Sequence, residues 1–139
     1  MQNYYVDLHI HIGRTYSGKP VKITASRSLT IPSIIHESFF RKGMNMIGII
    51  DGHVPEVVWE FEQLIEKGEM VELADGGLQY QDLTIILGSE IEVYDEHCHG
   101  PIHVLVYFGT IREMKEFSLW LGAKTLDKLI QSVGTEMYI

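Results

Sequence analysis

Cysteine is almost absent from this sequence, and so are the segments that carry a protein into or through a membrane. Cys98 is the single cysteine among 139 residues, which excludes an internal disulfide and fits a reducing compartment. No apolar run reaches the length of about 18 residues that a bilayer span needs. The first residues, Met-Gln-Asn-Tyr-Tyr, lack the basic segment and apolar run of a signal peptide. We therefore expect a cytoplasmic protein without a membrane partner.

Positive charge and glycine-rich nucleotide motifs are also scarce. The chain has 11 Lys and Arg residues against 19 Asp and Glu residues, a formal net charge of −8. A protein that binds nucleic acid through its surface is usually basic, so this balance counts against that role unless bound divalent cations reverse the local field. The sequence has no P-loop, no G-x-G-x-x-G and no G-x-S-x-G elbow. P-loop hydrolysis, dinucleotide redox chemistry and serine hydrolase chemistry are thus poorly supported.

The apolar pattern predicts strands and helices in alternation. Strands are predicted over residues 4–11, 46–50, 83–90 and 102–108, with a hairpin over 69–80. Helices are predicted over 30–42, 55–68, 110–117 and 125–133. Alternating βα units indicate an α/β barrel or an open doubly wound sheet. A closed eight-unit barrel needs about 200 residues or more, so only part of one fits here.

The most informative segment is Asp7-Leu8-His9-Ile10-His11, at the end of the first predicted strand. Side chains two residues apart on a strand share a face, so Asp7, His9 and His11 point to one side. Imidazole is the commonest neutral nitrogen ligand for divalent transition metals, and a neighbouring carboxylate can orient it. The pattern predicts a metal site with His9 and His11 as ligands and Asp7 as the orienting carboxylate.

Two further predicted strands end in groups of the same chemistry. Asp51 and His53 directly follow the second strand, and Glu90 lies at the end of the third. The carboxyl ends of parallel strands form one rim in α/β folds, so these groups are expected beside the first two histidines. The alternatives are a helix-start role for Asp51 with His53, and a solvated strand end for Glu90.

His103 begins its strand and would lie at the wrong rim of an all-parallel sheet. We therefore predict a hairpin over 89–107 with its turn near Glu96 and His97, which sets Glu90 opposite His103. Opposed residues have Cβ atoms about 4.5–5.5 Å apart, close enough to share one ion. A register slip of one residue would break this pairing. Taken alone, a histidine of this kind is more often a hydrogen-bonded core residue than a ligand.

The remaining basic and sulfur-bearing groups have two interpretations each. Arg14, Lys19 and Lys22 lie in the polar loop after the first strand, where they either hold a phosphate or are solvated. The segment His97-Cys98-His99 offers zinc-binding groups but lies in an acidic loop without a second cysteine pair. His36 lies among polar neighbours on a predicted helix and is expected at the surface.

Together these motifs resemble the PHP (polymerase and histidinol phosphatase) superfamily. The similar segments are Asp7-Leu-His9-Ile-His11, Gly48-Ile-Ile-Asp51-Gly-His53, Gly88-Ser-Glu90-Ile and Ile102-His103-Val-Leu. The resemblance implies a metal-dependent phosphoesterase on a distorted barrel of seven strands. Residues 1–139 are then expected to be the N-terminal portion of a PHP domain. They would form an α/β part of a distorted (β/α)7 barrel, with parallel βα units and a β-hairpin, truncated before the last metal-binding motifs.

Finer features resemble the endonuclease Q branch, whose members cut DNA on the 5′ side of deaminated bases. They are the loop segments Ile12-Gly13-Arg14-Thr15 and Gly18-Lys-Pro20-Val-Lys22-Ile-Thr24, with Arg41-Lys-Gly43-Met44 and Gly88-Ser-Glu90-Ile-Glu92. The superfamily more often has adjacent Asp and His in its second motif, whereas Gly52 separates Asp51 from His53 here. The resemblance leaves open which of these two binds metal.

The resemblance also implies roles for individual residues. The implied ligands of clustered Zn²⁺ or Mn²⁺ are His9, His11, His53, Glu90 and His103, with Glu90 as a bridging carboxylate. We assign catalytic roles to Asp51 and Glu90, and phosphate clamping to Arg14, Lys19 or Lys22. The implied reaction is hydrolysis of a phosphate ester by a water that the ions activate. The later histidine motif and the final Asp-x-His motif are absent from the sequence, which predicts an incomplete site.

Three functions stay open at this point. The first is a DNA endonuclease acting at deaminated or damaged bases, with DNA as partner of the full-length protein and with the activity of an isolated fragment left open. The second is a small-molecule phosphomonoesterase of the histidinol phosphatase type. The third is a non-catalytic, PHP-derived scaffold domain. An open part of a barrel would expose sheet edges and apolar helix faces, so self-association is also expected.

Overall fold

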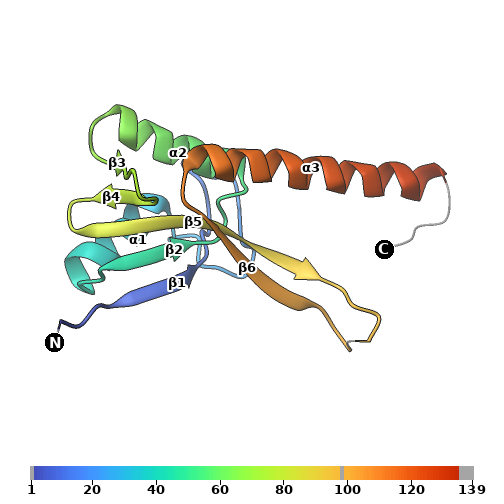
Figure 1. The fold of residues 1–139 in the computed structure, drawn as a ribbon, viewed down its shortest axis with the longest axis horizontal. Helices are drawn as coiled ribbons and strands as arrows, with labels where there is room; N and C mark the ends of the chain where they lie inside the picture. Colours follow the sequence, from blue (N-terminus) through green and yellow to red (C-terminus); the bar gives the residue numbers. More distant parts are fainter. Residues whose placement is uncertain (1, 98, 135–139) are drawn as a thin grey trace.

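The computed structural model describes residues 2–97 and 99–134. Figure 1 shows the described strands gathered in one sheet, with helices packed against it and a long hairpin that projects from it. The elements in chain order are β1 (Val6–Ile10), α1 (Ile31–His36), the short π-helix η1 (Glu37–Arg41), β2 (Met46–Ile49), α2 (Pro55–Glu66), β3 (Val71–Glu72), β4 (Leu78–Tyr80), β5 (Leu83–Val93), β6 (Ile102–Phe108) and α3 (Ile111–Gly134).

The sheet is mixed and open, which corrects the predicted barrel. Its six described strands run in the order β1-β2-β5-β4-β3, and β6 also pairs with β5. β1, β2 and β5 are parallel neighbours, whereas the pairs β3–β4, β4–β5 and β5–β6 are antiparallel. In a barrel, further parallel strands would follow β5, whereas here β5 is followed by its antiparallel neighbours β4 and β6. β1 and β3 remain separate edges of the described sheet. The expectation of a distorted (β/α)7 barrel is therefore wrong for residues 2–97 and 99–134.

One hydrophobic core joins the sheet to its helices. Ile47, Ile49 and Ile85 from the central strands are fully buried. Phe61 from α2 and Met114 from α3 belong to the same buried cluster. Burial of side chains this large stabilises the fold by roughly 1.5–3 kcal/mol each. The core therefore fixes the parallel strands whose carboxyl ends carry the candidate site.

The helix boundaries follow the capping signals in the sequence. Thr30 caps α1 in a reciprocal capping box, and Pro55 lies in the first turn of α2. Gly68 follows α2 with a φ of +79°, a left-handed conformation that favours glycine. At the start of α3, the Glu113 backbone N–H donates to Thr110 Oγ1 over 3.1 Å. The predicted starts of these three helices are confirmed.

α3 is one helix of 24 residues, where the sequence pattern predicted two. The predicted gap between them contains Gly122, but a glycine inside a helix costs only about 1 kcal/mol relative to alanine. That cost is too small to end a helix whose first turns are held by packing. In the described residues, neither α3 nor a shorter helix combines the length and apolar character needed to cross a bilayer.

The β5–β6 hairpin forms, but its register differs by two residues from the predicted one. Glu92 pairs with His103, and Glu90 pairs with Leu105. Side chains alternate along a strand with a period of two, so a two-residue shift keeps His103 on the face of Glu90. The predicted direct pairing of Glu90 with His103 is wrong, yet the two side chains stay neighbours.

β1 carries an irregularity within the predicted metal-binding segment. Asp7 pairs with Ile47 and Ile10 pairs with Ile49, so three steps along β1 match two steps along β2. An extra residue of this kind bends a strand and redirects its side chains. The pairing of β1 with β2 is therefore irregular in this segment, although Asp7, His9 and His11 still line one cavity.

Candidate metal centre

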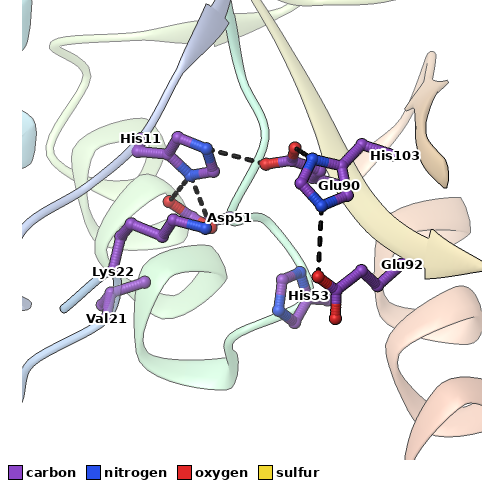
Figure 2. Close-up of a pocket in the computed structure, with 8 residues that line it drawn as sticks. All are labelled: His11, Val21, Lys22, Asp51, His53, Glu90, Glu92 and His103. Atoms are coloured by element: carbon purple, nitrogen blue, oxygen red, sulfur yellow. Dashed lines mark hydrogen bonds and ion pairs between the residues drawn. The ribbon is translucent and has the colours of Figure 1, made fainter. Parts of the chain in front are cut away.

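Polar side chains that lie on or directly after four strands line one open pocket of about 270 Å³ (Figure 2). β1 leads into His11, β2 leads into Asp51 and His53, β5 contributes Glu90, and β6 contributes His103. Because β1, β2 and β5 are parallel, their carboxyl ends converge at this edge of the sheet. The complete lining is His11, Val21, Lys22, Asp51, His53, Glu90, Glu92 and His103.

Glu90 contacts three imidazoles. Its Oε2 lies 2.8 Å from His11 Nε2 and 3.7 Å from His9 Nε2. Its Oε1 lies 3.0 Å from His103 Nδ1. The Glu90 side chain is only 11% exposed, and a carboxylate with so little water needs polar partners. One carboxylate thus contacts histidines from β1, from the residue directly after β1 and from β6.

Asp51 holds the other side of His11. His11 Nδ1 lies 3.1 Å from Asp51 Oδ2 and 3.3 Å from Oδ1. Asp51 Oδ2 also accepts the backbone N–H of Ile12 over 2.8 Å, and the aspartate is buried. A carboxylate on one ring nitrogen fixes the orientation of an imidazole and raises the basicity of the other nitrogen. That other nitrogen is the one beside Glu90, so Asp51 occupies an orienting position.

Asp7 makes a different contact from the one predicted for it. Its Oδ1 accepts the backbone N–H of His9 over 3.0 Å. Asp7 lines a neighbouring cavity of about 410 Å³ together with His9 and His11, and it is not among the residues that line the pocket around Glu90. Asp7 therefore stays beside the two histidines, and the hydrogen bond of its carboxylate is to the backbone of His9.

His53 is held by two serines. Its Nδ1 lies 2.8 Å from the hydroxyl of the fully buried Ser89, and its backbone carbonyl accepts from Ser118 Oγ over 2.5 Å. Burial lowers the pKa of His53, against a smaller opposing effect of the Asp51 charge. An imidazole with a lowered pKa is neutral at pH 7, which is the form that binds a metal. With Nδ1 taken by Ser89, Nε2 is the nitrogen left for a ligand.

Glu92 belongs to the same cluster, although no role is predicted for it from the sequence. Its Oε1 lies 3.1 Å from His103 Nε2, and its Oε2 accepts from the Tyr94 hydroxyl over 3.1 Å. These two hydrogen bonds, the first above all, lower the pKa of Glu92. The signal that could have found it is spacing, because residues 90 and 92 share a face of one strand.

The three predicted phosphate-binding residues separate in space. Lys22 lines the pocket, because the loop returns to the strand end where the Lys22 backbone N–H donates to the Ile12 carbonyl over 3.0 Å. Arg14 lines a different cavity, of about 380 Å³, that it shares with Glu60. Lys19 lies in the exposed turn of the loop, where its carbonyl accepts from the Thr15 backbone. Among the described residues that line the pocket, Lys22 is therefore the one member of this group of three.

The other histidines do not line this pocket. His36 is exposed on α1, as predicted, with its ring 5.2 Å from that of Phe40. His97 is exposed between β5 and β6, and its ring nitrogen lies 3.7 Å from Glu96. The alternative zinc site at His97-Cys98-His99 depends on Cys98, which lies outside the described residues.

The donor set fits a divalent transition metal. One nitrogen each from His9 and His11 and one oxygen from Glu90 lie within 4.8 Å of one another. Zn²⁺ and Mn²⁺ both accept imidazole nitrogen and carboxylate oxygen as ligands. His53 and His103 line the same pocket as His11 and Glu90, whereas His9 lines the neighbouring cavity with Asp7. The described residues therefore provide enough donors of the right kind for at least one ion.

A comparison with curated proteins finds similarity to the uncharacterized protein YqxK of Bacillus subtilis (strain 168), with 52% identity over 124 residues. The match covers 89% of this chain and 32% of the relative, so the chain spans about a third of that protein's length. No protein-family model matches the chain. No solved structure matches it either.

Proposed function

We propose that the described residues carry the metal-binding part of a phosphoesterase. The observation that carries this proposal is the contact of Glu90 with His9, His11 and His103. Imidazoles gathered around a carboxylate are typical ligands of hydrolytic metal sites. The resemblance to the PHP superfamily supports the same reaction, and this support depends on the ligand residues rather than on a closed barrel.

The reaction proposed is hydrolysis of a phosphate ester. The oxygen of a water bonds to phosphorus, the ester P–O bond breaks, and the leaving oxygen takes a proton. A divalent ion bound by these residues would lower the pKa of that water and neutralise charge on the phosphoryl oxygens. Asp51 keeps His11 Nδ1 occupied and so leaves Nε2 to ligate, while Lys22 offers a positive charge to a phosphoryl oxygen in the same pocket.

The finer part of the proposal is a DNA endonuclease that cuts beside deaminated bases, as the endonuclease Q branch does. The net charge of −8 gives this chain few basic groups to hold a DNA backbone. The chain also spans about a third of the length of YqxK. We therefore propose that most DNA contacts belong to a longer protein of that kind.

The first test is the metal content of the chain after dialysis against Zn²⁺ or Mn²⁺ and removal of free ion. We expect about one equivalent or more per chain. Glu90→Gln should weaken binding about tenfold or more, because the three imidazoles lose the anion that they share. His36→Ala removes an exposed imidazole on α1 and should bind metal like the wild type. Equal metal content in the wild type and Glu90→Gln would contradict the proposed site.

The second test separates the candidate reactions. Metal-loaded chain is incubated with bis-p-nitrophenyl phosphate, a diester, and with p-nitrophenyl phosphate, a monoester. Hydrolysis that Glu90→Gln abolishes and His36→Ala retains supports the phosphoesterase, and the preferred ester tells a diesterase from a phosphomonoesterase. Metal binding without hydrolysis of either ester would contradict catalysis by this chain and favour a scaffold domain. Cleavage of a strand containing one deoxyinosine, measured with a protein of YqxK length, tests the endonuclease.

A further inference from the structure

One tyrosine ring crosses the sheet beside the candidate metal centre. The Tyr107 side chain extends from β6 over β5 and β2, and its hydroxyl donates to the Leu8 carbonyl of β1 over 2.5 Å. A Cβ placed on Gly88 would lie 2.9 Å from the ring Cδ1, and one placed on Gly48 would lie 3.0 Å from the ring Cε1. The ring therefore rests on two glycines, one in each intervening strand, and a larger residue at either position would lift it off the sheet.

The carbonyl that Tyr107 reaches lies in the irregular part of β1. The pairing of β1 with β2 shifts between Asp7 and Ile10, and Leu8 lies within that interval. The extra residue of a bulge is left out of the strand ladder, so a side-chain hydrogen bond can take the place of a ladder bond there. Leu8 directly precedes His9, and the hydrogen bond thus acts on the backbone that carries the histidines of β1.

The same ring also lies on the strands that carry the partners of those histidines. Tyr107 pairs directly with Gly88, two residues before Glu90 on the same face of β5. His103 lies on the same strand as Tyr107. From these contacts we infer that Tyr107 is a positioning residue of the proposed metal centre. Its hydroxyl holds β1 so that His9 and His11 reach Glu90.

This inference rests on the proposed function for its metal readout, and the test compares two variants. Tyr107→Phe removes the hydroxyl and keeps the ring on the glycines, while Tyr80→Phe removes a tyrosine hydroxyl from β4, outside the pocket. Zinc affinity is measured by competition with a chromophoric chelator. We expect Tyr107→Phe to bind zinc about three- to tenfold more weakly and Tyr80→Phe to bind like the wild type.

Amide hydrogen exchange in the metal-free proteins separates positioning from general stability. Faster exchange confined to β1 in Tyr107→Phe, together with weaker zinc binding, supports the inference. Unchanged zinc affinity would overturn it. So would a loss of affinity with faster exchange across the whole sheet, β4 included, because Tyr107 would then be a general structural residue.

If the wild type binds no zinc, the proposed function is contradicted, but the positioning role of Tyr107 can still be tested. The imidazole NMR signals of His9 and His11 are then compared in the metal-free proteins. Shifted signals in Tyr107→Phe, with wild-type signals in Tyr80→Phe, support positioning by the hydroxyl. Identical signals in all three proteins overturn it.

Discussion

The carboxylate of Asp51 makes contacts in both the fold and the candidate site. It accepts the backbone N–H of Ile12 and contacts Nδ1 of His11, while almost no water reaches it. The sequence predicts a catalytic role for Asp51, and the contact with His11 adds an orienting role. Loss of an orienting carboxylate lowers metal affinity, because the ligand that it holds is no longer fixed. Loss of a purely catalytic carboxylate lowers the rate of hydrolysis and leaves metal affinity unchanged.

Asp51→Asn distinguishes these roles. An amide contacts His11 without the negative charge, so we expect zinc affinity to fall about 10- to 100-fold. The buried hydrogen bonds that weaken should lower the free energy of unfolding by about 1–3 kcal/mol. Asp82→Asn, at an exposed position before β5, is the control for the loss of one carboxylate. Unchanged zinc affinity with slower ester hydrolysis would instead favour a purely catalytic Asp51.

The raised pKa of Glu60, a residue outside the metal centre, predicts that the stability of the fold depends on pH. Burial raises its pKa, against a smaller lowering by the backbone N–H of Tyr16, and the Glu56 charge adds to the rise. A raised carboxyl pKa means that the folded state binds more protons than the unfolded one. The contribution to stability is therefore present below the unfolded pKa of about 4.5 and is lost as pH rises through the folded pKa.

Glu60→Gln cannot ionise and keeps an oxygen for the Tyr16 N–H. We expect it to melt at a higher temperature than the wild type at pH 7 and at nearly the same temperature at pH 3.5. The gain should be a fraction of a kcal/mol, because solvent screens a partly exposed group. Glu66→Gln, at the exposed end of α2, controls for the change in net charge. Melting that differs equally at both pH values would contradict the assignment.

The β5–β6 hairpin is the element that completes the candidate site. It carries Glu90 on one strand and His103 on the other, and its backbone register sets how closely they approach. Gly88 lies at a close approach of the two strands, because an added Cβ would lie 2.3 Å from the Val106 carbonyl oxygen. A carbon and a carbonyl oxygen cannot lie so close, so any larger residue at this position would force the backbone to shift. The pairing of these strands therefore requires glycine at position 88.

Two glycine substitutions test the hairpin as a unit. Gly88→Ala should lower the free energy of unfolding by about 1–3 kcal/mol through overpacking. Gly100→Ala, near the turn of the hairpin, places a Cβ where no described atom lies within 4 Å. Its effect should stay within about 0.5 kcal/mol. Urea unfolding measures both, and equal destabilisation by the two variants would contradict the close approach at Gly88.

Several large apolar side chains of the molecule are exposed to solvent. Leu119 is 75% exposed and Trp120 is 53% exposed on α3, while Ile102 and Val104 are exposed on β6. Figure 1 shows α3 and the β5–β6 hairpin extending beyond the sheet in diverging directions. β1 also forms an edge of the described sheet. Exposed apolar patches and strand edges are surfaces on which proteins associate.

We accordingly expect the chain to self-associate as its concentration rises. Sedimentation velocity should show a mean mass that grows with concentration. Replacing both Leu119 and Trp120 with Glu should shift the distribution toward the monomer. Arg112→Glu, an exposed change near the start of α3, should shift it less. A single boundary at the monomer mass over a wide concentration range would contradict this expectation.

Local patterns in the sequence were enough to find most elements and most of the polar groups in the pocket. Thr30, Pro55 and Thr110 mark helix starts because capping depends on neighbours within one turn. Asp51 and Glu90 were found because a polar residue at the end of an apolar strand is a local signal. Glu92 and Ser89 were missed because their importance comes from His103 and His53, which lie elsewhere in the chain.

Contacts between distant residues decided what local patterns could not. The bulge in β1, the two-residue shift of the β5–β6 hairpin and the open mixed sheet all depend on how whole strands pair. Tyr107 and Leu8 are 99 residues apart in the sequence, and only the sheet brings them together. The types of chemical group at the candidate site follow from composition and spacing. Their arrangement follows from packing, because strand register is set by the sum of many weak contacts along the sheet.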